Sequence, residues 1–135
     1  KGLEDGLSIE YSDTGKVITK GEFIEGLEQG EWFYDVGDHR EEGAYVDGQR
    51  QGEWKHYTED GTVLFEGRFE QGRPDGKHVF YYPSGKVKER GKYVIGNKEG
   101  DWVKYYEDGT IMQTITYEND VEKRIDGVKI PESEP

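Results

Sequence analysis

Apolar and aromatic residues recur along the chain in short stretches of alternating polarity, and glycine-containing turns separate these stretches. Residues 52–76 show the pattern most fully, with Trp54 and Tyr57 before a turn at 59–61 and apolar residues at 63, 65 and 69 after it. Alternation with a period of two predicts strands, and Asp-Gly or Ser-Gly between two strands favours a tight turn. Helix is disfavoured, because Ala44 is the only alanine and glycine interrupts every stretch with helical spacing. The pattern therefore predicts a β-hairpin.

The hairpin pattern repeats along the chain. Each repeat opens with a glycine, and another glycine stands four residues before it. Residues 1–5 have the form of a repeat's tail, so we expect the parent protein to extend further at its N-terminus. The repeats open at Gly6, Gly30, Gly52, Gly76 and Gly100, at spacings of 24, 22, 24 and 24 residues.

Repeat positions are numbered here from the opening glycine as position 1. Tryptophan recurs at position 3 and tyrosine at position 6, so the two sets are expected on opposite faces of a regular strand. Positions 12, 16 and 18 share parity and are expected on one face, where the glycine at position 16 would let an aromatic ring lie against bare backbone. The second repeat is two residues short before its turn, and Tyr34 and Gly37 are expected to stand in for positions 6 and 10.

The expected fold is all-β: an elongated antiparallel array of about five stacked β-hairpin repeats in a single-layer or lightly curled sheet. About ten strands at roughly 4.8 Å each would extend about 45 Å. The repeat domain is expected over 1–130, with a flexible tail at 131–135. The last repeat has Ile115 and Asp120 where glycine is expected, which is typical of a cap, and Val128 and Ile130 are expected to pair along the last strand.

Composition changes this expectation only in part. Hydrophobic residues make up 31% of the chain, the mean hydropathy is -1.04 and the formal net charge is -12, all of which favour disorder. Aromatic residues nevertheless make up 13% and recur at fixed repeat positions, which favours a folded but thin molecule. The chain has no cysteine, which rules out disulfides and cysteine-based metal sites.

Candidate chemistry is sparse. The triplet 13–15, Asp-Thr-Gly, is that of aspartic proteases, but the equivalent triplets 59–61 and 83–85 are ordinary turn sequences, so we interpret it as a turn. His39, His56 and His78 stand at unrelated repeat positions and form no helical ligand pair. No catalytic residue, metal ligand or cofactor-binding residue is therefore predicted.

Charge bears on the partner. A strongly acidic chain is repelled by nucleic acid and by anionic phospholipid surfaces, so a protein partner is expected. The nearest basic cluster has its members at odd repeat positions, on one face of a return strand. This face is either simply solvated, the favoured interpretation, or a docking stripe for an acidic partner segment. The cluster consists of Lys86, Lys88, Arg90 and Lys92.

The tryptophans are the second candidate set. Trp32, Trp54 and Trp102 either pack between neighbouring hairpins or form an exposed aromatic row that binds a partner. Stacking requires residues that recur in every repeat, so packing is the favoured interpretation.

The skeleton G-x-W-x-x-Y…D-G-x-V…E-G-x-F/Y…G-x-x-x-G resembles MORN repeats (membrane occupation and recognition nexus), and in particular the bacterial variant with tryptophan at position 3. It extends from Gly2 to about Tyr117, most clearly at 52–72 and 100–117. The resemblance implies a β-hairpin array for protein–protein contacts, often within larger proteins. Some bacterial relatives are labelled as antitoxin components, others look like envelope lipoproteins, and eukaryotic relatives are linked to acidic phospholipids.

We therefore expect a non-enzymatic module for protein–protein interaction or scaffolding within a larger protein or assembly. An antitoxin-like inhibitor that masks a basic toxin is the first alternative, because complementary charge speeds such binding. An accessory segment of a larger enzyme is the second. The edge of the N-terminal strand is expected to be open to a partner strand. The compartment stays open, with the bacterial cell envelope, as lipoprotein or periplasmic protein, favoured over the cytoplasm.

Overall fold

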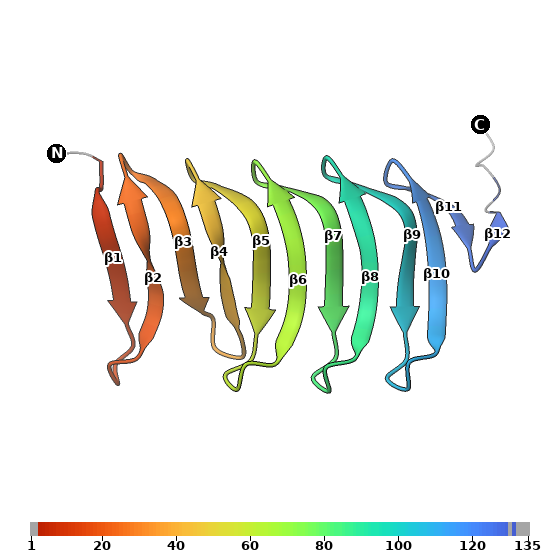
Figure 1. Cartoon of the computed structure of the whole chain (residues 1–135), viewed down its shortest axis with the longest axis horizontal. Coiled ribbons are helices and arrows are strands. Elements are labelled where there is room, and N and C mark those ends of the chain that lie inside the picture. Colours follow the sequence, from red (N-terminus) through yellow and green to blue (C-terminus); the bar gives the residue numbers. More distant parts are fainter. Residues whose placement is uncertain (1–2, 130, 132–135) are drawn as a thin grey trace.

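The fold is a single-layer antiparallel sheet of twelve strands that follow one another in sequence order (Figure 1). The computed structural model describes residues 3–129 and 131. The all-β, elongated hairpin array expected from the sequence is confirmed, with two more strands than the ten anticipated. Ile130 and all of the predicted tail except Pro131 lie outside the described residues. The strands are β1 (Gly6–Tyr11), β2 (Val17–Ile24), β3 (Leu27–Asp35), β4 (Arg40–Val46), β5 (Gln49–Tyr57), β6 (Val63–Glu70), β7 (Arg73–Tyr81), β8 (Val87–Val94), β9 (Asn97–Tyr105), β10 (Ile111–Glu118), β11 (Val121–Ile125) and β12 (Val128–Lys129).

The links between repeats are two-residue turns whose central residues both have positive φ, as in Asp47 (51°) and Gly48 (80°). This backbone matches the twist of the flanking strands and is the usual choice for tight hairpins. Each link also bonds to the start of the strand that follows the preceding link: the Gly48 amide donates to the Glu28 carbonyl of β3 at 2.9 Å, and the Gly96 amide donates to the Pro74 carbonyl of β7 at 2.8 Å. The Gly-x-x-x-Gly spacing thus creates a ladder of turns along one edge.

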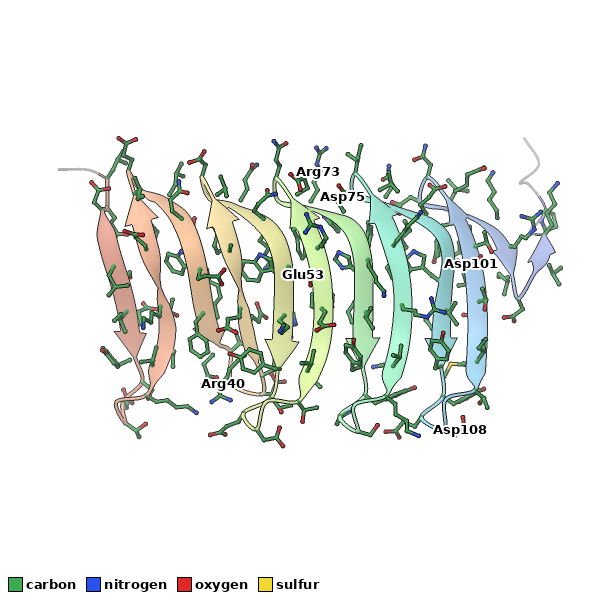
Figure 2. The ribbon with its side chains drawn as sticks, in the orientation of Figure 1. Arg40, Glu53, Arg73, Asp75, Asp101 and Asp108 are labelled. Atoms are coloured by element: carbon green, nitrogen blue, oxygen red, sulfur yellow. The ribbon has the colours of Figure 1, made fainter. Side chains whose placement is uncertain are left out.

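Side chains reinforce this ladder. The residue before an opening glycine points at the next link, as where Asp75 Oδ1 accepts the Ile95 amide at 3.1 Å and Glu99 Oε1 accepts the Asn119 amide at 2.9 Å. Figure 2 shows Asp75 at this end of the sheet, while Asp108 lies at the hairpin turns of the opposite end.

The core is a row of rings on one face of the sheet, which we call the tryptophan face. Trp32, Trp54 and Trp102 are only 3%, 1% and 3% exposed, and His78 takes the same place in its repeat at 3%. Each ring nitrogen bonds a carbonyl ten residues earlier, for example Trp54 Nε1 to Ala44 O at 3.0 Å and His78 Nε2 to Arg68 O at 2.8 Å. The ring is thereby fixed across the neighbouring strand.

Glycine at repeat position 16 makes room for these rings. A Cβ added to Gly43 would lie 2.2 Å from the Trp54 ring, and one added to Gly91 would lie 2.0 Å from the Trp102 ring. Only bare backbone can lie so close to an aromatic face. The rings also meet edge to face, with centroids of Tyr45 and Trp54 5.2 Å apart. The predicted packing of aromatic rings on position-16 glycines is confirmed.

The opposite surface, which we call the tyrosine face, differs in one respect from the expected pattern. In β8, Glu89 pairs with Phe80 and Val87 pairs with Tyr81, so Lys88 has no partner and forms a bulge. Directly opposed residues share a face, so the bulge places Val87 with Tyr81. The expectation that position 12 shares a face with positions 16 and 18 is therefore wrong, whereas the opposition of Trp and Tyr holds.

The short second repeat also differs from expectation. Asp35 pairs with Arg40 in a register without a bulge, so the two missing residues are one turn residue and the bulge residue. The Tyr34 ring stacks on the Trp32 ring, with centroids 5.9 Å apart. The Tyr34 hydroxyl lies 3.0 Å from the Tyr45 hydroxyl. Tyr34 thus lies on the tryptophan face at repeat position 5, and the expectation that it replaces the position-6 tyrosine is wrong.

Candidate functional site

The tyrosine face carries half-buried aromatic and apolar side chains between charged ones. Val79 and Val103 are each 7% exposed, which gives this face a small apolar stripe of its own. The same face carries a tyrosine at the end of every second strand in the later repeats: Tyr57, Tyr81 and Tyr105.

The tyrosine hydroxyls are engaged by charged neighbours. Tyr81 OH donates to Glu66 Oε1 at 3.0 Å, and Arg90 Nε donates to Tyr105 OH at 2.8 Å. Burial, reinforced by nearby carboxylates, raises the pKa of Tyr57 and of Tyr81. These hydroxyls therefore stay protonated at neutral pH and can donate hydrogen bonds.

The basic cluster predicted from the sequence is divided. Lys86 lies in the turn, and Lys88, in the bulge, places its ammonium 5.8 Å from the Tyr82 ring centre. Arg90 and Lys92 continue the regular alternation on the tyrosine face, where Lys92 pairs with Lys77 on one side. The expectation that all four basic residues lie on one face of the strand is therefore wrong, because the bulge at Lys88 interrupts the alternation of side chains. A shallow groove on the tyrosine face joins Lys77, Arg90 and Lys92 to the carboxylates of Glu99 and Asp101.

The tryptophans predicted as partner-binding residues are core residues by burial. Trp32, Trp54 and Trp102 form no exposed row, in keeping with the favoured interpretation that they pack between hairpins. A direct role in partner binding stays a prediction against which their burial argues.

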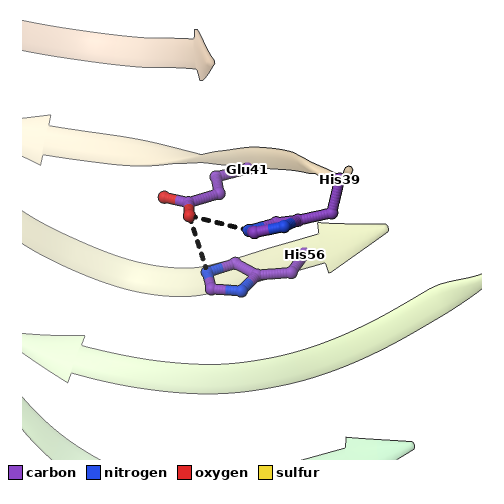
Figure 3. Close-up of side chains that lie close together, drawn as sticks. All are labelled: His39, Glu41 and His56. Atoms are coloured by element: carbon purple, nitrogen blue, oxygen red, sulfur yellow. Dashed lines mark hydrogen bonds and ion pairs between the residues drawn. The ribbon is translucent and has the colours of Figure 1, made fainter. Parts of the chain in front are cut away.

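A group of ligating side chains that the sequence analysis did not bring together lies on the tryptophan face of β4 and β5 (Figure 3). His39 stands just before β4, Glu41 lies on β4, and His56 lies opposite Glu41 on β5. Glu41 Oε2 is 3.0 Å from His39 Nε2 and 3.8 Å from His56 Nε2. The two imidazole rings stack with centroids 5.0 Å apart. All three side chains are 21–29% exposed, so the group opens to solvent.

The two histidines differ in electrostatics. Burial opposes the charged form of His39, but the carboxylates of Glu41 and Asp38, which accept hydrogen bonds from its ring, outweigh this effect and raise the pKa of His39. Burial lowers the pKa of His56, and the Glu41 carboxylate only partly offsets this effect. Two imidazoles and a carboxylate in this arrangement offer the nitrogen and oxygen donors that borderline metal ions such as zinc prefer.

A signal for this group was present in the sequence. Position 5 of one repeat pairs with position 14 of the preceding repeat, as Phe80 pairs with Phe65. Once the two missing residues of the second repeat are allowed for, Glu41 corresponds to position 14, and the same register pairs it with His56. His39 stands two residues before Glu41, on the same face of the sheet. The histidines stand at unrelated positions within their repeats, whereas strand pairing joins positions of neighbouring repeats.

An open single-layer array of hairpins, with both faces accessible around a thin core, defines the molecule as a repeat protein. A family model described as the MORN repeat variant matches residues 4–25, 50–71, 74–94 and 98–119. The chain therefore belongs to the MORN repeat variant family, whose repeats are non-catalytic modules that commonly mediate protein or membrane interactions. No curated protein was found to match the chain. Across the part of the chain that the structure describes, no helix is long and apolar enough to cross a membrane.

The segment 26–49 falls between the matched stretches. It contains most of the short second repeat, including His39 and Glu41, whereas His56 lies in the matched stretch 50–71.

Proposed function

We propose that this chain is a non-enzymatic interaction module that binds a protein partner through its tyrosine face. The observation that carries this proposal is the layer structure: within residues 3–129, no second layer packs on the sheet, so the tyrosine face is open. The tryptophan face is also uncovered, but its largest rings, Trp32, Trp54 and Trp102, are buried by packing within the sheet and leave little of their surface for a partner. The interaction role of MORN repeats in general supports the same reading.

The tyrosine face has the residue types of a protein interface. Tyr57, Tyr81 and Tyr105 lie two strands apart in succession, which corresponds to about 9.6 Å between neighbours. Tyrosine offers a large apolar ring together with a hydroxyl donor, and it is enriched at the centres of interfaces. A partner with an extended segment across the strands would meet one ring per repeat.

Charge on this face selects among partners. On β5 and β6 each acid faces a base, because Glu53 pairs with Arg68 and Glu66 pairs with Lys55. On β7 and β8, in contrast, Lys77 pairs with Lys92. A partner segment that is acidic over β7 and β8 would complement this basic pair. The formal net charge of -12 argues against an anionic membrane as the main target.

The test compares face variants in a pull-down of the full-length protein from its native cells. Tyr81→Ser with Tyr105→Ser removes two tyrosines of the tyrosine face, and Tyr106→Ser removes an exposed turn tyrosine as a matched control. We expect one stoichiometric partner with the wild type and the control, and at least a tenfold loss with the double variant. Equal recovery with all three proteins would refute the role of the tyrosine face.

Salt distinguishes the finer alternatives. A single basic partner that is lost between low and moderate salt would support an antitoxin-like inhibitor, because exposed charges are screened over about 10 Å at 0.1 M salt. A larger envelope assembly that survives salt would support a scaffold of the cell envelope. A catalytic domain found within the same full-length chain would instead support an accessory segment of an enzyme.

A further inference from the structure

We propose that His39, Glu41 and His56 bind one Zn²⁺ ion. Their three ligand atoms lie within 4.8 Å of one another without any rearrangement of the backbone. The set of two histidines and one glutamate is one of the established zinc donor sets, in which the fourth position is left to water or to another ligand. This inference does not depend on the proposed partner binding, and the two are tested by different measurements.

The distances fit a tetrahedral ion. Donors at about 2.0–2.1 Å from zinc and at the tetrahedral angle stand about 3.4 Å apart. The two observed separations from Glu41 Oε2, 3.0 Å to His39 and 3.8 Å to His56, lie on either side of this value. Small side-chain rotations bring both nitrogens to the required spacing, and zinc replaces the His39–Glu41 hydrogen bond.

A carboxylate behind His39 supports the assignment independently. Asp38 Oδ1 lies 2.7 Å from His39 Nδ1, on the side of the ring away from Glu41. A proton on Nδ1 donates to Asp38 and leaves the Nε2 lone pair free to coordinate. Metal-binding histidines almost always donate their second ring nitrogen in this way, which orients the ring and makes the ligand more basic.

The short second repeat creates the site. In other hairpins a bulge at repeat position 13 separates the turn from position 14, as Leu64 does between Val63 and Phe65. The second repeat has no bulge, so His39 keeps the alternation of β4 and lies on the same face as Glu41. Equivalent cross-strand pairs in the neighbouring repeats offer no such donor set: they are Thr19–Tyr34, Phe65–Phe80 and Glu89–Lys104.

The surroundings leave the ion accessible. His39 and His56 line an open groove of about 350 Å³ together with Phe65, Phe80 and Lys88. Two carboxylates, those of Glu41 and Asp38, offset the charge of the ion. The positive charge of Arg50 repels the ion, but the Arg50 guanidinium is held by the Trp54 ring, 4.7 Å from its centre. The site is therefore an exposed three-ligand zinc site that joins β4 to β5.

The experiment is a calorimetric titration of the full chain with zinc chloride in millimolar Mg²⁺, which occupies weak acidic sites. We expect one equivalent of Zn²⁺ to bind to the wild type. Glu41→Gln and the pair His39→Phe with His56→Phe should abolish this binding, and Asp38→Asn should weaken it by about 10- to 100-fold. His78→Phe removes the third histidine, outside the site, and should leave it unchanged.

A second readout reports the ligands directly. X-ray absorption of the zinc-loaded wild type should show two imidazole nitrogens, and the thermal midpoint should rise with Zn²⁺ in the wild type but not in Glu41→Gln. Circular dichroism checks that each variant is folded, and Asp38→Asn and Glu41→Gln change side-chain volume least. Binding that is equal in all variants, or that does not saturate at one equivalent, would overturn the proposal.

Discussion

At the scale of single residues, the fold depends on pairs in which a large ring lies on a glycine. Position 3 supplies the ring and position 16 of the preceding repeat supplies the bare backbone, as in Trp102 and Gly91. Removing either member should therefore cost more than its own surface suggests, because the space is shared.

Gly91→Ala tests this pairing. The added Cβ would lie 2.0 Å from Trp102 Cδ2, so the ring must move, and overpacking of this kind costs about 1–3 kcal/mol. Gly109→Ala is the control, since no atom lies within 4 Å of its Cβ position and only its positive φ of 92° is strained. We expect a larger loss in urea unfolding for Gly91→Ala, with a red shift of tryptophan fluorescence. Equal losses without a red shift would contradict the shared-space argument.

His78 should make stability depend on pH. Burial lowers the pKa of His78, although Glu53 and the Arg68 carbonyl act in the opposite direction. The unfolded chain, with a histidine pKa near about 6.5, then binds the proton more readily than the folded chain. The contribution of His78 is therefore present above the unfolded-state pKa of about 6.5 and is lost progressively as the pH falls from there through the lower pKa of the folded state.

The measurement is the free energy of unfolding of wild type and His78→Phe across this range. The variant loses the hydrogen bond to Arg68 at every pH, so its stability is lower throughout. The difference between the two proteins should shrink on acidification. A difference that stays constant from about pH 8 to pH 5 would show that His78 is not protonated on unfolding.

At the scale of elements, the turns that link successive repeats differ in how well their first residue tolerates a positive φ. Two of the five link turns begin with a residue that readily adopts positive φ, namely Asp47 and Asn119. Ile95 has a φ of 47° in the same place, which is unfavourable for a β-branched side chain. Its side chain is 61% exposed, so little burial compensates.

Ile95→Asn should therefore stabilise the protein by about 1 kcal/mol, because asparagine adopts this backbone at lower cost. Ile111→Asn is a matched control at the start of β10, with a similar exposure of 59% but without a positive φ, and should bring no gain. The measurement is the urea midpoint of each variant relative to the wild type. A rise for Ile95→Asn no larger than that for Ile111→Asn would refute the strain at Ile95.

Elements also show how far the sequence could predict the structure. The period-two pattern and the glycine spacing predicted hairpins, turns and the opposition of Trp and Tyr, because these follow from local chemistry. The bulge at Lys88 and the true place of Tyr34 could not be predicted, since a bulge depends on pairing between strands rather than on one strand's pattern. The histidine–carboxylate group could not be predicted for the same reason, because its residues come from two repeats.

At the scale of the whole molecule, each described strand forms its ladder of hydrogen bonds only with its neighbours in sequence order. Stability in such an array is close to a sum of repeat terms and neighbour terms, so cooperativity depends on each link between repeats. Among the described residues, Trp54 is the most buried large side chain; it lies on β5, near the middle of the sheet, and its ring contacts both Tyr45 and the guanidinium of Arg50. Trp54→Ala removes the central ring of the row.

We expect Trp54→Ala to cost about 3–5 kcal/mol and to weaken the coupling between the two halves of the sheet. The remaining tryptophans, Trp32 and Trp102, then report on opposite halves, and Trp32→Phe or Trp102→Phe in the same background isolates one signal at a time. In the wild type the two signals should change together with urea, whereas in the Trp54→Ala background their midpoints should separate. Coincident midpoints in that background would mean that the backbone ladder of turns, rather than the ring row, transmits cooperativity along the sheet.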